Sequence, residues 1–190
     1  MIAVIDYNMG NIASIENILK KIGSKVVITS ESSVLQKAEK IILPGVGAFD
    51  YGMTNLHNLG ITDILKEKVI NSKTPLLGIC LGMQLLTVDS EEGLLPGLGF
   101  INAHTKKIPF DICEKKLKIP HMGWDYIYPK RESFLFKNSL EHMRFYFVHS
   151  YFVDCEDQSD ILATTEYGIE FASIIGKNNI YGVQFHPEKS

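Results

Sequence analysis

The chain has 190 residues, of which 45% are hydrophobic and 22% are charged, and its formal net charge at pH 7 is −3. These values are ordinary for a globular domain with a substantial core, and the weak negative charge argues against broad electrostatic binding to nucleic acid or an anionic membrane. No apolar run approaches the ~20 residues of a membrane-spanning helix, so we expect a soluble cytoplasmic protein with one domain over residues 1–190.

Strand and helix patterns alternate in the first half of the chain. Residues 2–6 form an apolar run without the basic region of a signal peptide, and they are predicted as a first strand. Apolar residues then recur at helical spacing from Ile12 to Ile22, and Gly23 is a suitable C-terminal stop. Further strands are predicted at 26–29, at 41–43 and before Cys80, with helical patterns at 55–59 and 61–70. This alternation predicts an α/β fold with a mainly parallel central sheet flanked by helices.

Short β-rich runs replace the helical patterns after about residue 95. Strands are predicted at 145–148, 161–165, 171–175 and 180–185, and the last two are joined by a hairpin turn at Gly176-Lys-Asn-Asn179. We expect these to be antiparallel or mixed strands added to the same core. Ligands of open α/β sheets bind beyond the carboxyl ends of the strands, which here are followed by the loops 6–11 and 44–47 and the turn at Cys80.

One cysteine lies between two glycines where an apolar strand gives way to a helical pattern, in Pro75-Leu-Leu-Gly-Ile-Cys-Leu-Gly-Met-Gln84. Cys80 is therefore predicted on a sharp strand-to-helix turn, with its sulfur lifted above the sheet edge like the nucleophile of an elbow. The alternative is a buried structural cysteine, because cysteine is among the most buried residue types. The other cysteines, Cys113 and Cys155, are distant in sequence, so neither a disulfide framework nor a Cys-x-x-Cys zinc site is indicated.

A histidine near the C-terminus is the best candidate for a base. His186 follows an apolar strand pattern and begins His-Pro-Glu188. Residues two apart in an extended segment project to the same side, so the Glu188 carboxylate can orient the ring for Cys80. The alternative is an ordinary turn at a strand end. A metal site is not expected, because these two possible ligands have no third at a recognisable spacing.

Backbone donors for a tetrahedral oxyanion are expected from two loops. Pro44-Gly-Val-Gly47 follows a buried strand, and its glycines allow close approach of the backbone to a ligand. The N–H of Leu81, just after Cys80, is the natural second donor. The alternative is a dinucleotide loop, but the third glycine of that motif is replaced by Asp50, whose charge would repel a pyrophosphate.

Five motifs occur together along the chain: Asp6-Tyr-Asn-Met-Gly-Asn11, Pro44-Gly-Val-Gly-Ala-Phe49, Gly78-Ile-Cys-Leu-Gly-Met-Gln-Leu-Leu86, Pro120-His-Met-Gly-Trp124 and Tyr146-Phe-Val-His-Ser-Tyr151. With the C-terminal His-Pro-Glu-Lys-Ser190, the set resembles the class I (triad) glutamine amidotransferases, which have a flavodoxin-like fold. More narrowly, it is similar to the glutaminase subunits of imidazole glycerol phosphate synthases. The resemblance covers essentially the whole chain.

The resemblance implies that Cys80 attacks the side-chain amide of glutamine, releases ammonia and forms a glutamyl thioester that water hydrolyses. His186 would carry the protons, Glu188 would orient it, and no cofactor is implied. Oxyanion and substrate contacts would come from Val46, Gly47, Leu81, Gln84, Ser150 and Tyr151.

The same resemblance implies a heterodimer. The partner would be a (β/α)8-barrel cyclase that receives the ammonia and makes imidazole glycerol phosphate and AICAR in histidine biosynthesis, and glutaminase activity would be low until it binds. The positions expected to face it are Asn11, Trp124, Tyr146 and Lys189.

One residue departs from the family pattern, and two other functions stay open. Asp125 follows Gly-Trp where the family usually has asparagine, which predicts an altered interface or hydrogen bond. The first alternative is a paralogous glutaminase that supplies ammonia for amidotransfer to a bacterial surface-polysaccharide sugar. The second is a non-catalytic binding module that keeps the fold, which the complete triad disfavours.

Overall fold

The computed structural model describes residues 1–109, 117–136 and 143–190, so Cys113 lies outside the described residues. The first half of the chain alternates strands with helices, as predicted. Its strands are β1 (Ile2–Ile5), β2 (Val26–Thr29), β3 (Lys40–Leu43) and β4 (Leu76–Ile79). Its helices are α1 (Ile12–Lys21), α2 (Ser32–Leu35), α3 (Phe49–Asn58), α4 (Ile61–Leu65), the π-helix η1 (Lys66–Asn71) and α5 (Leu81–Gln84).

The second half is dominated by strands. These are β5 (Asp89–Ser90), β6 (Ala103–Lys107), β7 (His121–Tyr126), β8 (Tyr128–Pro129), β9 (Arg144–His149), β10 (Tyr151–Cys155), β11 (Ile161–Glu166), β12 (Glu170–Lys177) and β13 (Ile180–Val183). Short 3-10 helices lie at η3 (Phe134–Phe136), η4 (Gln158–Asp160) and η5 (Pro187–Lys189). Among the described residues, no helix is long and apolar enough to cross a membrane.

A large mixed sheet organises the molecule. Its main path runs β2-β1-β3-β4-β13-β12-β10-β6-β5 within the described parts of the chain. The strands from β2 to β13 along this path are parallel, and β12 then pairs antiparallel with β13. A separate antiparallel pair is formed by β7 and β9. The predicted fold, a mainly parallel sheet with added antiparallel strands, is therefore confirmed.

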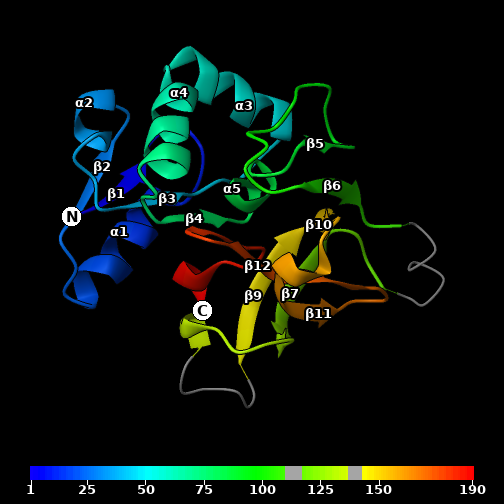
Figure 1. Ribbon diagram of the computed structural model, residues 1–190. Helices are drawn as coiled ribbons and strands as arrows, with labels where there is room; N and C mark the ends of the chain where they lie inside the picture. The colour runs from blue at the N-terminus through cyan, green and yellow to red at the C-terminus, as the bar shows by residue number, and fades with distance from the viewer. Residues whose placement is uncertain (110–116, 137–142) are drawn as a thin grey trace.

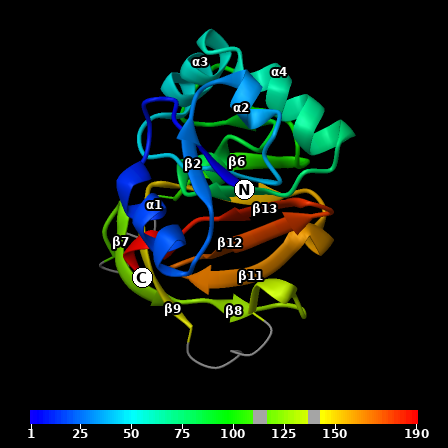
Figure 2. The same cartoon turned by 90° about the vertical axis from the view of Figure 1, so that its left-hand side faces the viewer.

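Two apolar cores fill the space on the two faces of this sheet. Helices α2 to α5 cover one face, where Ile5, Leu43 and Phe49 are among the fully buried side chains. Helix α1 and the β7–β9 pair lie on the other face, where Phe147 and Val183 are buried (Figures 1 and 2). Both sheet faces are thus covered, which explains why the parallel strands are apolar runs without alternation.

Three details differ from the predicted elements. Helix α3 begins at Phe49 instead of residue 55, because Phe49, Met53 and Leu56 form one buried face. Ile22 was predicted on the apolar face of α1, but it follows the last helical residue and is 67% exposed. The hairpin turn is shorter than predicted: Lys177 pairs with Ile180, and only two asparagines connect the strands.

Candidate active site

Cys80 lies in the one-residue turn between β4 and α5, at the carboxyl end of the parallel strands. Its φ of 54° and ψ of −110° are unusual for a residue with a side chain, and such strain is typical of functional sites. The flanking glycines make the turn possible. A Cβ on Gly82 would lie 1.8 Å from the Leu43 carbonyl oxygen, and one on Gly78 would lie 2.6 Å from the Gly82 oxygen. The structure thus places the thiol on the predicted sharp turn.

A cavity of about 260 Å³ opens beside Cys80. All six predicted oxyanion and substrate residues line it, namely Val46, Gly47, Leu81, Gln84, Ser150 and Tyr151. Four further lining residues were not predicted, namely Glu92, Pro120, Val148 and His149. Residues from both halves of the chain therefore meet at one cavity.

His186 and Glu188 do not line this cavity, but His186 lies next to Cys80. The register of β13 against β4 pairs Val183 with Ile79, which brings the segment after β13 alongside the Cys80 turn. His186 Nδ1 lies 2.9 Å from Glu188 Oε1, and both side chains are almost fully buried. Because a carboxylate only accepts, Nδ1 carries the hydrogen, and Nε2 is left for the sulfur.

Opposing influences act on the charge of His186. Burial lowers the pKa of His186, but the adjacent Cys80 thiol and the Glu188 carboxylate outweigh it and raise that pKa to about 9. Its Nε2 has no hydrogen-bond partner of ordinary geometry among the described residues, so it can exchange a proton with Cys80. The imidazole is therefore held in a form that can protonate a leaving group.

The sulfur of Cys80 has two further neighbours. It lies 3.8 Å from the Val148 carbonyl oxygen, to which the thiol donates, and the Gln184 side-chain amide donates to it at the same distance. Gln184 is fully buried. Sequence reasoning missed it, because one glutamine in an apolar strand gives no sign of which residue it faces.

The loop 44–47 lies against both the Cys80 turn and the loop 6–11. The buried Tyr7 hydroxyl donates to the Pro44 carbonyl oxygen at 2.5 Å, and burial raises the pKa of Tyr7. Gly47 has a φ of 126°, which disfavours any residue with a Cβ. The loops predicted to carry the site are therefore neighbours, as expected.

One predicted oxyanion donor is occupied in this structure. The N–H of Leu81 donates to the Gly45 carbonyl oxygen at 3.3 Å, instead of pointing to an open position in the cavity. The physical reason is the close packing of Gly45, where a Cβ would lie 2.8 Å from the Leu81 side chain. The loop must move before Leu81 can donate to an oxyanion.

Glu92 supplies the only carboxylate that lines the cavity in the described part of the chain. It accepts a hydrogen bond from the Phe49 N–H at 2.9 Å, at the start of α3. Burial raises the pKa of Glu92, Phe49 opposes this, and the nearby Asp50 adds to it. Nothing in its sequence spacing indicated this position, because the loop after β5 has no regular pattern.

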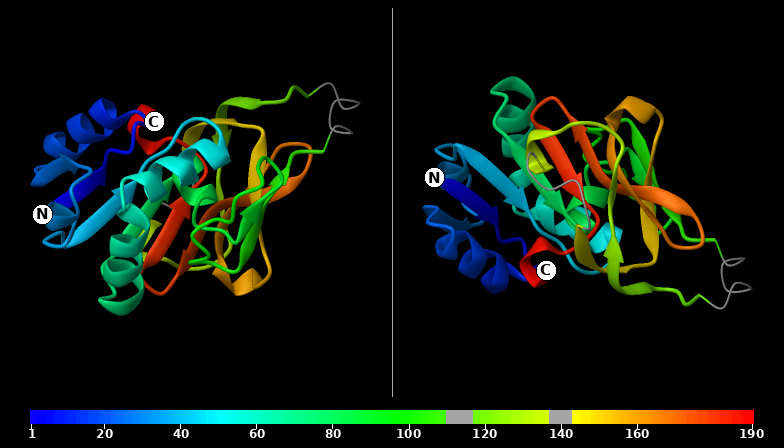
Figure 3. Two further views of the ribbon diagram at one scale, coloured as in Figure 1. Left: turned by 90° about the horizontal axis from the view of Figure 1, so that it is seen from above. Right: turned by 90° about the horizontal axis from the view of Figure 1, so that it is seen from below.

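The predicted partner-facing residues lie on one side of the molecule. Trp124 pairs with Tyr146 across β7 and β9, and their ring centroids are 6.2 Å apart. Lys189 Nζ lies 5.4 Å from the Tyr146 ring centroid. Asn11 precedes α1, which contacts η5, where the C-terminus lies (Figure 3). The exposed fraction of Trp124 is 48%, which suits an interface.

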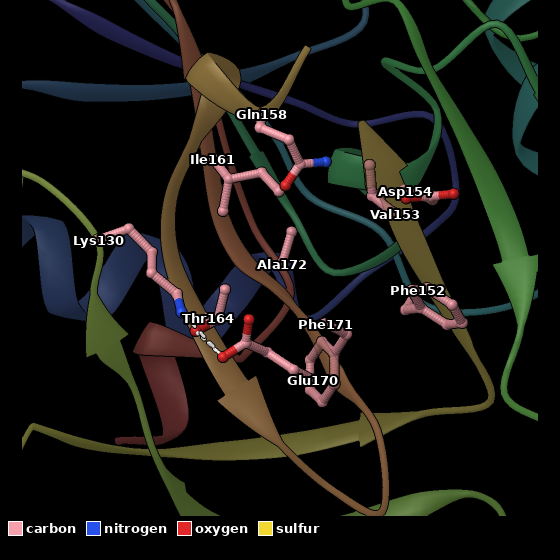
Figure 4. Close-up of a pocket in the computed structure, with 10 residues that line it drawn as sticks. All are labelled: Lys130, Phe152, Val153, Asp154, Gln158, Ile161, Thr164, Glu170, Phe171 and Ala172. Carbon is pink, nitrogen blue, oxygen red and sulfur yellow. Dashed lines mark hydrogen bonds and ion pairs between the residues drawn. The ribbon is translucent and has the colours of Figure 1, made fainter. Parts of the chain in front are cut away.

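A second cavity of about 330 Å³ lies between β10, β11 and β12 (Figure 4). Its charges are already paired: Lys130 contacts Glu170 at 2.9 Å, and Asp154 contacts Lys106 at 2.6 Å. No cysteine or histidine lines it. Within the described residues, no group of three histidine, cysteine or acidic side chains could hold a metal ion. The Cys80 cavity is therefore the better candidate for chemistry.

Comparison with known proteins gives one family across the chain. The family model described as "Glutamine amidotransferase class-I" matches residues 3–190. Among curated relatives, "Imidazole glycerol phosphate synthase subunit HisH 2" of Methanococcus maripaludis is 60% identical over 190 residues, covering 100% of this chain and 93% of the relative. The HisH subunit of Leptospira borgpetersenii and HisH 2 of Pseudomonas aeruginosa are each 45% identical with the same coverage.

Solved structures have the same fold at much lower identity. A crystal structure of a glutamine amidotransferase has a TM-score of 0.72 and 17% identity, covering 98% of this chain and 90% of that one. A glutamine amidotransferase from Thermotoga maritima has a TM-score of 0.67 and 17% identity, covering 98% of this chain and 75% of that one. At this identity the likeness concerns the fold alone.

Proposed function

Because the chain belongs to the class I glutamine amidotransferase family, we propose that it is the glutaminase subunit of an imidazole glycerol phosphate synthase. It hydrolyses glutamine to glutamate and supplies ammonia for histidine biosynthesis. The observation that carries this proposal is the meeting of Cys80 and six predicted contact residues at one cavity, with the His186–Glu188 pair next to Cys80.

The reaction follows from the proton positions at this triad. The Cys80 sulfur, its proton held by His186, adds to the amide carbon of glutamine and forms a tetrahedral oxyanion. His186 then gives that proton to the amide nitrogen, the C–N bond breaks, and ammonia leaves. A water, losing a proton to His186, attacks the resulting thioester. The C–S bond breaks to give glutamate, and the proton returns to the sulfur.

We assign the two ends of glutamine to different residues that line the cavity. We propose that the Glu92 carboxylate binds the α-ammonium group, because an acceptor of negative charge in a partly buried site favours a cation. Ser150 and Tyr151 lie at the same end and contact the rest of the amino-acid group. Gln84 and Gly47 contact the side chain that reaches Cys80.

Activation is expected to involve the loop 44–47. With the Leu81 N–H bonded to the Gly45 carbonyl, an oxyanion lacks one of its donors, and one such donor is worth roughly 10²–10³ in kcat. A partner that draws this loop away frees the donor. The glutaminase is therefore expected to be slow alone and fast in its complex, which prevents waste of glutamine.

The proposed partner is a (β/α)8-barrel cyclase that binds the face formed by Trp124, Tyr146, Lys189 and Asn11 in a heterodimer. An exposed indole beside a cation is a suitable anchor for such an interface. We further propose that residues 1–190 form one domain and act in the cytoplasm, without a cofactor.

The test is a glutaminase assay of the purified chain, alone and with the cyclase from the same genome. Cys80→Ser should lower glutamine-dependent synthesis by 10³ or more, as loss of an activated nucleophile does, and leave ammonia-dependent synthesis by the partner within about twofold. Loss of both activities would show that Cys80 serves only the structure. If wild type with its cyclase releases no glutamate from glutamine, and the Cys80 variant behaves identically, the non-catalytic module is favoured instead.

A second acceptor is worth testing, because two of the relatives carry the name HisH 2. Asp125 is a further reason, since it departs from the asparagine expected at the partner-facing strand. In that case the ammonia serves amidotransfer to a surface-polysaccharide sugar. Complementation of a histidine auxotroph that lacks its own glutaminase separates the two, because only the first function restores growth without histidine.

A further inference from the structure

A continuous series of hydrogen-bonding groups connects strand β7 with the nucleophile. We call it the relay, and its members are Asp125, His121, His149, the Tyr151 carbonyl, Gln84, Gln184 and Cys80. It begins one residue from Trp124, on the face proposed for the partner. It passes the glutamine cavity at Tyr151 and Gln84, and it ends at the sulfur.

The half nearest Cys80 has a fixed direction. Gln84 Nε2 donates to the Tyr151 carbonyl oxygen at 3.0 Å and to Gln184 Oε1 at 3.2 Å. With its oxygen accepting from Gln84, Gln184 presents its amide nitrogen to the Cys80 sulfur at 3.8 Å. A donor aimed at sulfur stabilises the thiolate more than the thiol, because the bond to an anion is charge-assisted. Gln184 is therefore oriented by Gln84 to favour the reactive form.

The half nearest Asp125 can be assigned by counting protons. Its three contacts are His149 Nδ1 to the Tyr151 oxygen at 2.8 Å, His121 Nδ1 to His149 Nε2 at 3.0 Å, and His121 Nε2 to Asp125 Oδ2 at 3.5 Å. Both ends of this series, a carbonyl and a carboxylate, are acceptors. Two neutral rings carry two protons, which can complete only two of the three contacts.

Both rings are neutral at physiological pH. Burial lowers the pKa of His149 to about 3, with a further contribution from His121, and burial lowers the pKa of His121 to about 4 against the influence of Asp125. The titratable groups facing them are Asp125 on β7, Tyr167 stacked on His121 at 3.9 Å, and His186 beyond His149.

The distances show which contact lacks its proton. The two short contacts are hydrogen bonds, so each ring carries its proton on Nδ1 and points it toward Tyr151. The long contact at Asp125 joins two acceptors. The carboxylate favours the reversed order, in which His121 donates to it and the Tyr151 carbonyl loses the His149 donor and keeps only the bond from Gln84. An asparagine at 125 would donate to Nε2 and complete all three contacts.

We propose that the relay positions the Cys80 sulfur and the residues of the glutamine cavity. Gln184 is its positioning residue at the sulfur. At the other end, the Asp125 carboxylate competes with the Tyr151 carbonyl for the protons of the His121 and His149 rings. This proposal deepens the proposed function and rests on Cys80 as its nucleophile. A group that binds the β7 face can then change which nitrogens of His121 and His149 are protonated. A cation beside the Asp125 carboxylate, for example, weakens the attraction of that carboxylate for the His121 proton.

The first test measures the Cys80 thiolate without glutamine. Alkylation of Cys80 by iodoacetamide, followed in its peptide by mass spectrometry, should slow about tenfold at pH 7 in Gln184→Met, as expected for loss of one charge-assisted hydrogen bond. The deficit should disappear near pH 10, because ordinary cysteine thiols are ionised there. Gln158→Met is the matched control and should alkylate at Cys80 like wild type, because the Gln158 amide donates to the backbone carbonyl oxygen of Cys155 and not to the Cys80 sulfur. Alkylation within twofold of wild type in folded Gln184→Met overturns the role of Gln184.

The second test needs no destabilising substitution. The ¹⁵N shifts of His121 and His149 in the wild-type chain should show both rings protonated on Nδ1, and a proton on Nε2 of either ring overturns the assigned order. In the complex with the cyclase, Asp125→Asn should lower the KM for glutamine about two- to fivefold, as one completed hydrogen bond allows, with kcat within twofold. An unchanged or higher KM removes Asp125 from the proposal. Because alkylation and ¹⁵N shifts do not involve glutamine, they hold or fail independently of the glutaminase assay.

Discussion

Replacing Glu188 by glutamine tests how the triad histidine is charged. The His186–Glu188 contact is 2.9 Å long, and both side chains are almost fully excluded from solvent. A hydrogen bond to a charged group in such a site is worth about 1.5–3 kcal/mol, and one pKa unit corresponds to about 1.4 kcal/mol. The pKa of His186, which burial lowers but Cys80 and Glu188 raise to about 9, should therefore fall by roughly one to two units in Glu188→Gln.

The same substitution changes how stability depends on pH. The folded-state pKa of His186 lies above the ~6.5 of an unfolded histidine, so its stabilising contribution is fully present below pH 6.5 and is lost as the pH rises through 9. Wild type should lose on the order of 3 kcal/mol of unfolding free energy from this group over that range. The variant should lose about 1–2 kcal/mol.

The assay follows the His186 ring by NMR from pH 6 to 10, together with urea unfolding at pH 6.5 and pH 9. Glu170→Gln is a matched control, because the Glu170 carboxylate is exposed and paired with Lys130 at 2.9 Å. It should leave the His186 titration unchanged. If folded Glu188→Gln titrates at His186 like wild type, Glu188 does not hold the ring and the triad assignment fails.

Three further predictions concern packing, acid stability and the interface. Gly82→Ala places a Cβ against the Leu43 carbonyl oxygen. It should lower the free energy of unfolding by about 3 kcal/mol or more, which corresponds to a fall of roughly 10 °C in Tm by calorimetry. An unchanged Tm would contradict the packing at the Cys80 turn. The pKa values of His121 and His149 in the folded chain lie below that of an unfolded histidine. The free energy of unfolding should therefore fall by about 1.4 kcal/mol per pH unit per histidine as the pH falls from 6.5 toward 4. Equal urea midpoints at pH 7 and pH 5 would exclude buried neutral rings. Trp124→Ala should weaken binding of the cyclase about 30-fold or more, measured by calorimetric titration, because the exposed indole is the expected anchor. The Tm of the isolated chain should change by less than about 2 °C. A large fall in Tm would place the indole in the core instead.

The sequence predicted the elements whose local pattern is strong. The elbow at Cys80 follows from an apolar strand, two small glycines and a helical pattern, all within ten residues. The strands β1 to β4 follow from short apolar runs between turn signals. The end of α1 follows from Gly23, which has a φ of 79°. Each of these depends on residues that are close in the chain.

Features that depend on tertiary packing were not predictable in this way. Glu92 reaches the cavity because its loop folds over the start of α3, 43 residues earlier in sequence. The contact between His121 and His149 depends on the register of β7 against β9, which no local pattern fixes. The blocked N–H of Leu81 depends on the position of the loop at Gly45. In each case the deciding partner is distant in the chain.

The register between β13 and β4 links the two proposals for Cys80. Val183 pairs with Ile79, and the Cys80 N–H donates to the Val183 carbonyl oxygen at 2.8 Å, so Gln184 is the next residue opposite the nucleophile. His186 follows two residues later, at the spacing that returns a side chain to the same side of an extended segment. A slip of β13 by one residue would turn both Gln184 and His186 to the opposite face. The pairing of β13 with β4 therefore places both the His186 ring and the Gln184 amide beside the Cys80 sulfur. A substitution that shifts β13 should lower glutaminase activity and the reactivity of the Cys80 thiolate together.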